Sequence, residues 1–67
     1  MIKNNLSRIM GAKRLKIAVV ARDTGINRGT ITRLYNETAV RIDLDVLDKL
    51  CKYLDCTPGD LFERVEE

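Results

Sequence analysis

The 67-residue chain has no histidine, only two cysteines, one proline and few aromatic residues. Without histidine or a third cysteine it cannot complete the usual tetrahedral ligand set for zinc, so we expect no metal site. The chain also has no cysteine beside an evident base and no glycine-rich phosphate loop, so we expect neither an enzyme nor a cofactor. Cys51 and Cys56 lie five positions apart at the end of a helical pattern, and we interpret Cys51 as a small apolar core residue.

Long apolar runs are absent as well. No segment approaches the ~20 apolar residues needed to cross a membrane. The N-terminal stretch MIKNNLSRIMGAKRLK has basic residues but no apolar core, so it is not a signal peptide. A hydrophobic content of 45% with 33% charged residues is typical of globular proteins. We therefore expect a single cytoplasmic domain over residues 1–67, with a marginal core that a dimer partner would help to stabilise.

The net charge of +2 conceals a strong asymmetry. Residues 1–36 hold eight basic and one acidic side chain, a net charge of +7. Residues 37–67 hold four basic and nine acidic side chains, a net charge of −5. Such a dipolar molecule presents one end to a polyanion and keeps the other end away from it.

Apolar residues recur at helical spacing in five stretches, which predicts helices over residues 5–13, 16–24, 28–36, 44–55 and 58–62. Asn27, Asp43 and Thr57 are placed to cap three of them, and Pro58 suits a first helical turn. Lys16 stands where a capping residue is expected and opposes the helix dipole. The helix at 44–55 is predicted to bury one apolar stripe: Leu44, Leu47, Leu50, Cys51 and Leu54.

The two chain ends, residues 1–3 and 63–65, alternate apolar and polar side chains over very few positions. They can remain unpaired or form a small two-stranded ribbon, and the pattern does not decide between these alternatives. The predicted fold class is therefore all-α, a compact arrangement of five helices with or without a terminal ribbon.

The most informative stretch is residues 17–36, IAVVARDTGINRGTITRLYN. Ala21 is small enough to let a second helix approach, and Gly25 supplies a turn with positive φ at the end of the first helix. Ile31 and Leu34 repeat at helical spacing and would fix the second helix against the core. This pattern predicts a helix-turn-helix whose second helix keeps a free polar face.

With these features the chain resembles the Cro/cI-type, lambda-repressor-like family of helix-turn-helix regulators. The resemblance covers nearly all of the chain and rests on the AxxxGI element, the NRGTITRLYN helix and the closing LDKLCKYLDCTPGDLF pattern. It implies a five-helix DNA-binding fold, a role in transcription regulation as a repressor, and binding as a homodimer to a palindromic operator in double-stranded DNA. No small-molecule ligand is expected.

Two positions depart from the family pattern. The family usually opens its second helix with a polar residue, often glutamine, that contacts a phosphate, and Ile17 stands there. Lys16 is our candidate for replacing that contact. Thr24 occupies a position that is usually aliphatic, and we expect a mild loss of packing there.

In this geometry the third helix enters the major groove and its outward side chains read base edges. Arg33 has an ordinary alternative as a solvated arginine, and Lys13 and Arg14 can instead favour the end of the first helix. The residues expected to contact bases are Arg28, Gly29, Thr32 and Arg33. The residues expected to contact phosphates are Lys13, Arg14, Lys16, Arg22, Asn27, Thr30 and Asn36.

One small domain buries too little DNA surface for tight specific binding, so we expect a twofold dimer reading two half-sites. The candidate dimer residues are Tyr53, Leu61, Phe62 and Val65, although Phe62 is equally suited to the core. An alternative function is a protein-interaction module of the same fold, such as an antitoxin-like partner. Its contact surface would be the apolar run at residues 17–20.

Overall fold

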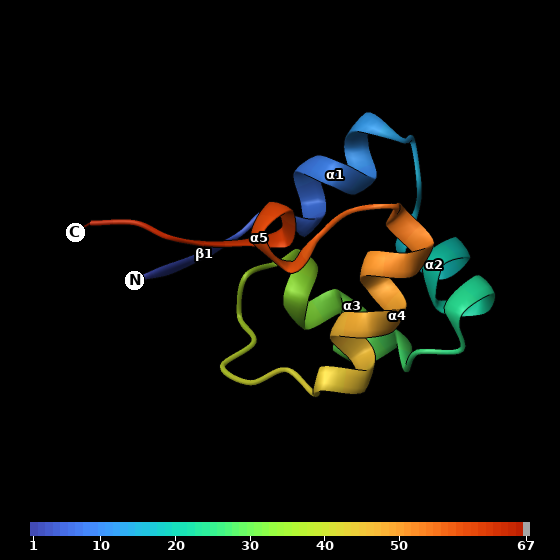
Figure 1. Cartoon of the computed structure of the whole chain (residues 1–67). Coiled ribbons are helices and arrows are strands. Elements are labelled where there is room, and N and C mark those ends of the chain that lie inside the picture. Colours follow the sequence, from blue (N-terminus) through green and yellow to red (C-terminus); the bar gives the residue numbers. More distant parts are fainter. Residues whose placement is uncertain (67) are drawn as a thin grey trace.

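The computed structural model describes residues 1–66, which form five helices and a two-stranded ribbon (Figure 1). In chain order the elements are β1 (Ile2–Asn4), α1 (Leu6–Ala12), α2 (Ile17–Thr24), α3 (Arg28–Tyr35), α4 (Leu44–Leu54), α5 (Pro58–Leu61) and β2 (Phe62–Arg64). The five-helix prediction is confirmed, with most helix ends shifted by one residue. None of the helices within residues 1–66 has the length and apolarity needed to cross a membrane.

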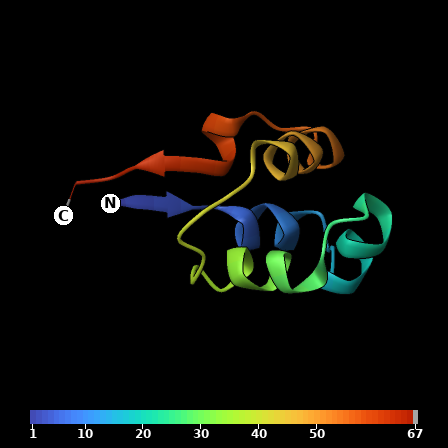
Figure 2. The ribbon, with the colours of Figure 1, turned by 90° about the horizontal axis from the view of Figure 1, so that it is seen from below.

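The two chain ends pair as an antiparallel ribbon. The sequence pattern alone did not decide between such a ribbon and unpaired ends. Ile2 faces Arg64, Lys3 faces Glu63 and Asn4 faces Phe62. Figures 1 and 2 show the ribbon projecting at one end of the molecule, with α2 at the opposite end. Side chains alternate between the two faces of a strand, so Ile2, Asn4 and Phe62 share one face.

The core draws apolar side chains from every helix and from the turn between α2 and α3. Leu44 was predicted to belong to it, but 80% of its surface is exposed. It begins α4 at the edge of the molecule, and Leu50 is the first fully buried residue of that helix. Nine apolar residues have at most 6% of their surface exposed: Leu6, Met10, Val20, Ile26, Ile31, Leu34, Leu50, Leu54 and Leu61.

Two asparagines connect the ribbon to the helices. Asn5 is the buried polar residue of the described chain, and its amide donates to the Asp60 carbonyl at 3.2 Å and to Glu63 Oε1 at 3.3 Å. Asn4 Nδ2 donates to the carbonyl oxygen of Leu34 at 2.6 Å, near the end of α3. Because these partners lie far away in the sequence, the two side chains hold β1, α3 and α5 in one arrangement.

Two of the three predicted helix caps are confirmed. Thr57 and Asp60 form a reciprocal capping box, with Thr57 Oγ1 accepting from the Asp60 amide at 3.1 Å and Asp60 Oδ2 accepting from the Thr57 amide at 2.9 Å. These hydrogen bonds hold the pKa of Asp60 below its usual value. Asp43 stands at the predicted N-cap position of α4, but its exposed side chain accepts no capping hydrogen bond within residues 1–66. Only its carbonyl oxygen takes part, accepting from the Leu47 amide at 3.0 Å.

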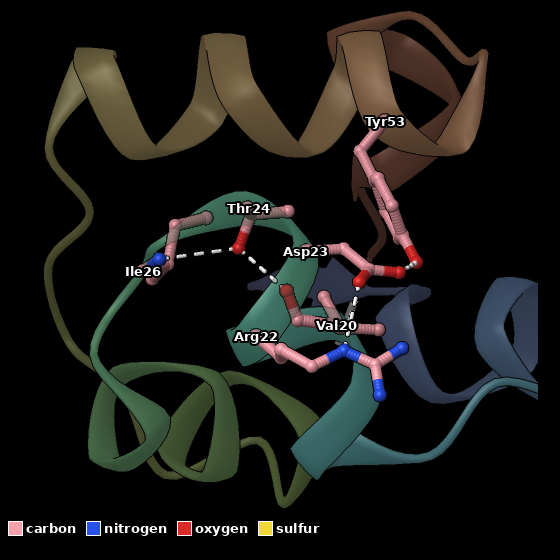
Figure 3. Close-up of polar contacts among 6 residues, drawn as sticks. All are labelled: Val20, Arg22, Asp23, Thr24, Ile26 and Tyr53. Carbon is pink, nitrogen blue, oxygen red and sulfur yellow. Dashed lines mark hydrogen bonds and ion pairs between the residues drawn. The ribbon is translucent and has the colours of Figure 1, made fainter.

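The end of α2 combines a left-handed glycine with a side-chain bridge from Thr24, and Figure 3 shows the bridge. Gly25 has φ 75° and donates its amide to the Ala21 carbonyl at 2.9 Å. Thr24 Oγ1 donates to the Val20 carbonyl at 2.6 Å and accepts from the Ile26 amide at 3.2 Å. These hydrogen bonds give Thr24 a role that the sequence did not predict, because its hydroxyl links the last turn of α2 to the residue that follows the bend.

We expect Gly25→Ala to destabilise the fold by about 1–2 kcal/mol, because a Cβ disfavours the left-handed region. A Cβ at Gly25 would meet no atom within 4 Å, so the cost comes from the backbone alone. Gly11→Ala in α1 is the matched control, since a Cβ there also meets nothing and φ is not positive. That variant is expected to gain about 0.5–1 kcal/mol. Urea unfolding of both variants checks the pair, and equal effects would contradict the explanation.

Candidate nucleic-acid interface

Helix α3 has a buried face and an outward face. Ile31 and Leu34 have 0% and 3% of their surface exposed, which fixes the helix on the core. Asn27 Oδ1 caps its start by accepting from the amides of Gly29 at 2.8 Å and Thr30 at 3.3 Å, which confirms the predicted cap. The other predicted α3 contacts lie outward: Arg28, Arg33 and Asn36 are exposed, and Gly29, Thr30 and Thr32 are half-buried.

Two side chains of the outward face are already oriented by contacts within the helix. Thr32 Oγ1 donates to the Arg28 carbonyl at 2.9 Å, which leaves its methyl group and its acceptor lone pairs for another molecule. Arg33 Nη2 donates to Thr30 Oγ1 at 3.4 Å, so its guanidinium folds back over the first turn. A Cβ at Gly29 would lie 3.0 Å from Asn27 Oδ1 and 3.3 Å from Arg33 Nη1. The absence of a side chain at this position therefore makes room for both the cap and the guanidinium.

Further cations lie on α1, α2 and their connection. Lys13, Arg14 and Lys16 are exposed, and Lys16 occupies the cap position of α2 without a side-chain hydrogen bond. Arg22 Nε donates to Asp23 Oδ1 at 3.1 Å, while the Arg22 side chain remains 72% exposed. These exposed cations belong to the part of the chain that precedes α3 and that carries most of the positive charge.

The comparisons with known proteins agree with this geometry. The family model of the Cro/C1-type HTH DNA-binding domain matches residues 5–67. The chain belongs to this family. It is also 29% identical over 59 residues to the "Uncharacterized HTH-type transcriptional regulator YozG" of Bacillus subtilis (strain 168), an alignment that covers 88% of this chain and 70% of that protein. The family predicted from residues 17–36 and from the closing pattern is confirmed, and α2 and α3 form the helix-turn-helix of this Cro/C1-type domain.

The apolar run at residues 17–20, the contact surface of the antitoxin-like alternative, is partly accessible, with Ala18 exposed and Val19 half-buried. Val20 is fully buried, and Ile17 is half-buried and packs against the core. Replacement of the usual polar residue by Ile17 therefore adds packing to this Cro/C1-type domain.

A hydrogen bond between α4 and α2 was not anticipated from the sequence. Tyr53 Oη donates to Asp23 Oδ2 at 2.6 Å (Figure 3). This hydrogen bond and the neighbouring Arg22 lower the pKa of Asp23, and the same contact raises the pKa of Tyr53. The two residues are thirty positions apart, so no local pattern predicts the pairing.

The four predicted dimer residues do not form one surface in the described chain. Leu61 has 1% of its surface exposed and belongs to the core. Tyr53 contacts α2 at one end of the molecule, whereas Phe62 and Val65 lie in or beside the ribbon at the other end (Figures 1 and 2). A single dimer interface could therefore include only some of the four predicted residues.

The two thiols lie together at the end of α4. Cys51 and Cys56 are half-buried and pack against the core, and for Cys51 this agrees with its interpretation as a small apolar residue. Burial and the adjacent Cys51 raise the pKa of the Cys56 thiol, which disfavours a reactive thiolate. Among residues 1–66 no three or more histidine, cysteine, aspartate or glutamate side chains are grouped to hold a metal ion.

Tyr53→Phe tests the connection between α4 and α2. The lowered pKa of Asp23 means that the contact stabilises the fold above pH 3.8 and that this contribution is lost as the pH falls through the lowered value. In alkaline solution the stabilisation by the Tyr53–Asp23 hydrogen bond is present below pH 10.0. It is lost as the pH rises through the raised pKa of Tyr53. We expect Tyr53→Phe to have a lower urea midpoint than the parent at neutral pH and the same midpoint in strong acid.

Tyr35→Phe is the matched control, because the Tyr35 hydroxyl makes no hydrogen bond within the described residues. Its urea midpoint should follow that of the parent at every pH. A difference between the parent and Tyr53→Phe that persists unchanged into strong acid would show that Asp23 is not the group responsible.

Proposed function

We propose that this chain is a transcriptional repressor that binds a palindromic operator as a homodimer, with α3 in the major groove of each half-site. Membership of a DNA-binding family and a relative named as a transcriptional regulator support the general role. The observation that carries the specific proposal is the outward face of α3, where Arg28, Thr32 and Arg33 stand opposite the buried Ile31 and Leu34. A repressor of this kind acts by occupying promoter DNA.

Arg28 is the principal candidate for reading a base. It is the first residue of α3 and is exposed, and a guanidinium there can donate bidentate hydrogen bonds to guanine O6 and N7. The methyl group of Thr32 suits a thymine methyl. In this proposal the Arg33 guanidinium turns from its position beside Gly29 toward the bases, and the backbone at Gly29 can then approach the edge of the groove.

Phosphate contacts would orient the protein without carrying sequence information. The amino end of α3 suits an anion because the helix dipole favours negative charge there, and the side-chain nitrogen of Asn27 can donate to a phosphate while its oxygen caps the Gly29 and Thr30 amides. In this proposal Lys16 replaces the missing polar residue at position 17 as the phosphate contact of α2. The other proposed phosphate contacts are Lys13, Arg14, Arg22, Asn27, Thr30 and Asn36.

Arg28→Ala tests base reading. We expect it to weaken binding to a selected operator by about 1–3 kcal/mol and to relax the base preference at one position, while binding to random DNA changes much less. Operator selection from a random pool followed by mobility shifts measures both effects. Lys52→Ala on α4, an exposed cation in the acidic half, is the control. Equal loss in both variants, or no loss with Arg28→Ala, would refute this role for α3.

Lys16→Ala tests the proposed phosphate contact. We expect affinity to fall by a similar factor for all DNA sequences, and the slope of log affinity against log salt to become shallower by about 1. Filter binding between low and moderate salt measures the slope. An unchanged slope would mean that α2 uses another cation or none.

A further inference from the structure

An apolar groove lies between the ribbon and the segment that connects α3 to α4. Its volume is about 270 Å³. Ile2 and Phe62 line it from the ribbon, Leu34 from α3, and Ala39, Val40 and Ile42 from the connecting segment. We call this the ribbon groove.

The exposure of the apolar side chains at the ribbon groove is unusually high. Val40 has 94% of its surface exposed and Ile2 has 63%. A single exposed aliphatic residue is ordinary, but exposed aliphatics that border an apolar groove indicate an interaction surface. The ribbon adds unpaired strand edges, which are a further site for association.

The charges at the ribbon groove are of both signs. Glu37 and Arg41 line it together with the apolar residues, and both are exposed. Neither side chain forms an ion pair with another residue in the described part of the chain. A twofold axis brings residue i against residue j and residue j against residue i, so a surface carrying one acidic and one basic group can complement itself.

We propose that the ribbon groove is the surface through which two copies of this chain associate, with Val40 entering the partner's groove and Glu37 facing the partner's Arg41. This inference rests on the homodimer of the proposed function and supplies its interface. A second copy fits better than an acidic or a basic ligand because the groove carries both charges. A second copy bound in this groove would also lie next to α3, since Leu34 at the end of that helix forms part of the groove wall.

Charge reversal with mixing tests the ionic part of the interface. Glu37→Arg and Arg41→Glu should each place like charges across the axis, and each should weaken self-association at least about tenfold. An equimolar mixture of the two variants should regain the association of the parent, because every contact across the axis is then between opposite charges. Sedimentation equilibrium without DNA measures each dissociation constant.

The mixture separates contacts between copies from contacts within one copy. If Glu37 and Arg41 acted only within one chain, the double variant would recover but the mixture would not, and this would overturn the proposal. Unchanged association of the two single variants would also overturn it. So would a parent chain that stays monomeric at about millimolar concentration.

Val40→Glu tests the apolar part, with Leu44→Glu as its matched control. Leu44 is 80% exposed but does not line the groove. We expect Val40→Glu to weaken the dimer at least about tenfold and Leu44→Glu to leave it unchanged, with both variants folded by circular dichroism. Equal effects of the two substitutions would overturn the proposed surface.

These outcomes are independent of the α3 model. Arg28→Ala should dimerise like the parent even where it fails to bind the operator. A chain that dimerises through the groove and does not bind DNA would refute the proposed function and leave the interface standing.

Discussion

The position of α3 depends on the bend that ends α2. Gly25 takes a left-handed conformation that side chains disfavour, and the Thr24 hydroxyl connects the Val20 carbonyl before the bend to the Ile26 amide after it. Ile26 is then drawn into the core with 6% of its surface exposed. Since α3 begins two residues later, these hydrogen bonds and the buried Ile26 set where the helix starts, and the buried Ile31 and Leu34 fix it on the core.

Contacts from distant parts of the chain also hold α2 and α3 in place. Asn4 binds the Leu34 carbonyl at the end of α3, and Tyr53 binds Asp23 on α2. The helix-turn-helix is therefore held from the ribbon on one side and from α4 on the other. Such support leaves the outward face of α3 free while restraining the helix that carries it, which is the requirement for reading bases at fixed positions.

The sequence predicted the features whose causes are local. A glycine at a bend, an asparagine at a helix start and a Thr-Pro pair each act through their own backbone, so Gly25, Asn27 and Thr57 could be interpreted without a fold. Leu44 was misassigned because helical spacing shows which residues share a face but not how far the neighbouring elements extend along it. Tyr53 and Asp23 could not be paired, because their contact depends on how α4 crosses α2. The conformation of Arg33 was equally hidden, since it depends on the space beside Gly29.

The ribbon links the proposed dimer interface to α3, the helix proposed to contact DNA. Asn4 lies on the strand face that borders the ribbon groove, and its amide donates to the last turn of α3 at 2.6 Å. Leu34, whose carbonyl accepts that bond, contributes to both the core and the groove. In the proposed dimer the side chains that meet across the axis are therefore adjacent to those that hold α3. The separation of the two α3 helices would then be set through the short, part-buried hydrogen bond between Asn4 and Leu34, as a fixed half-site spacing demands.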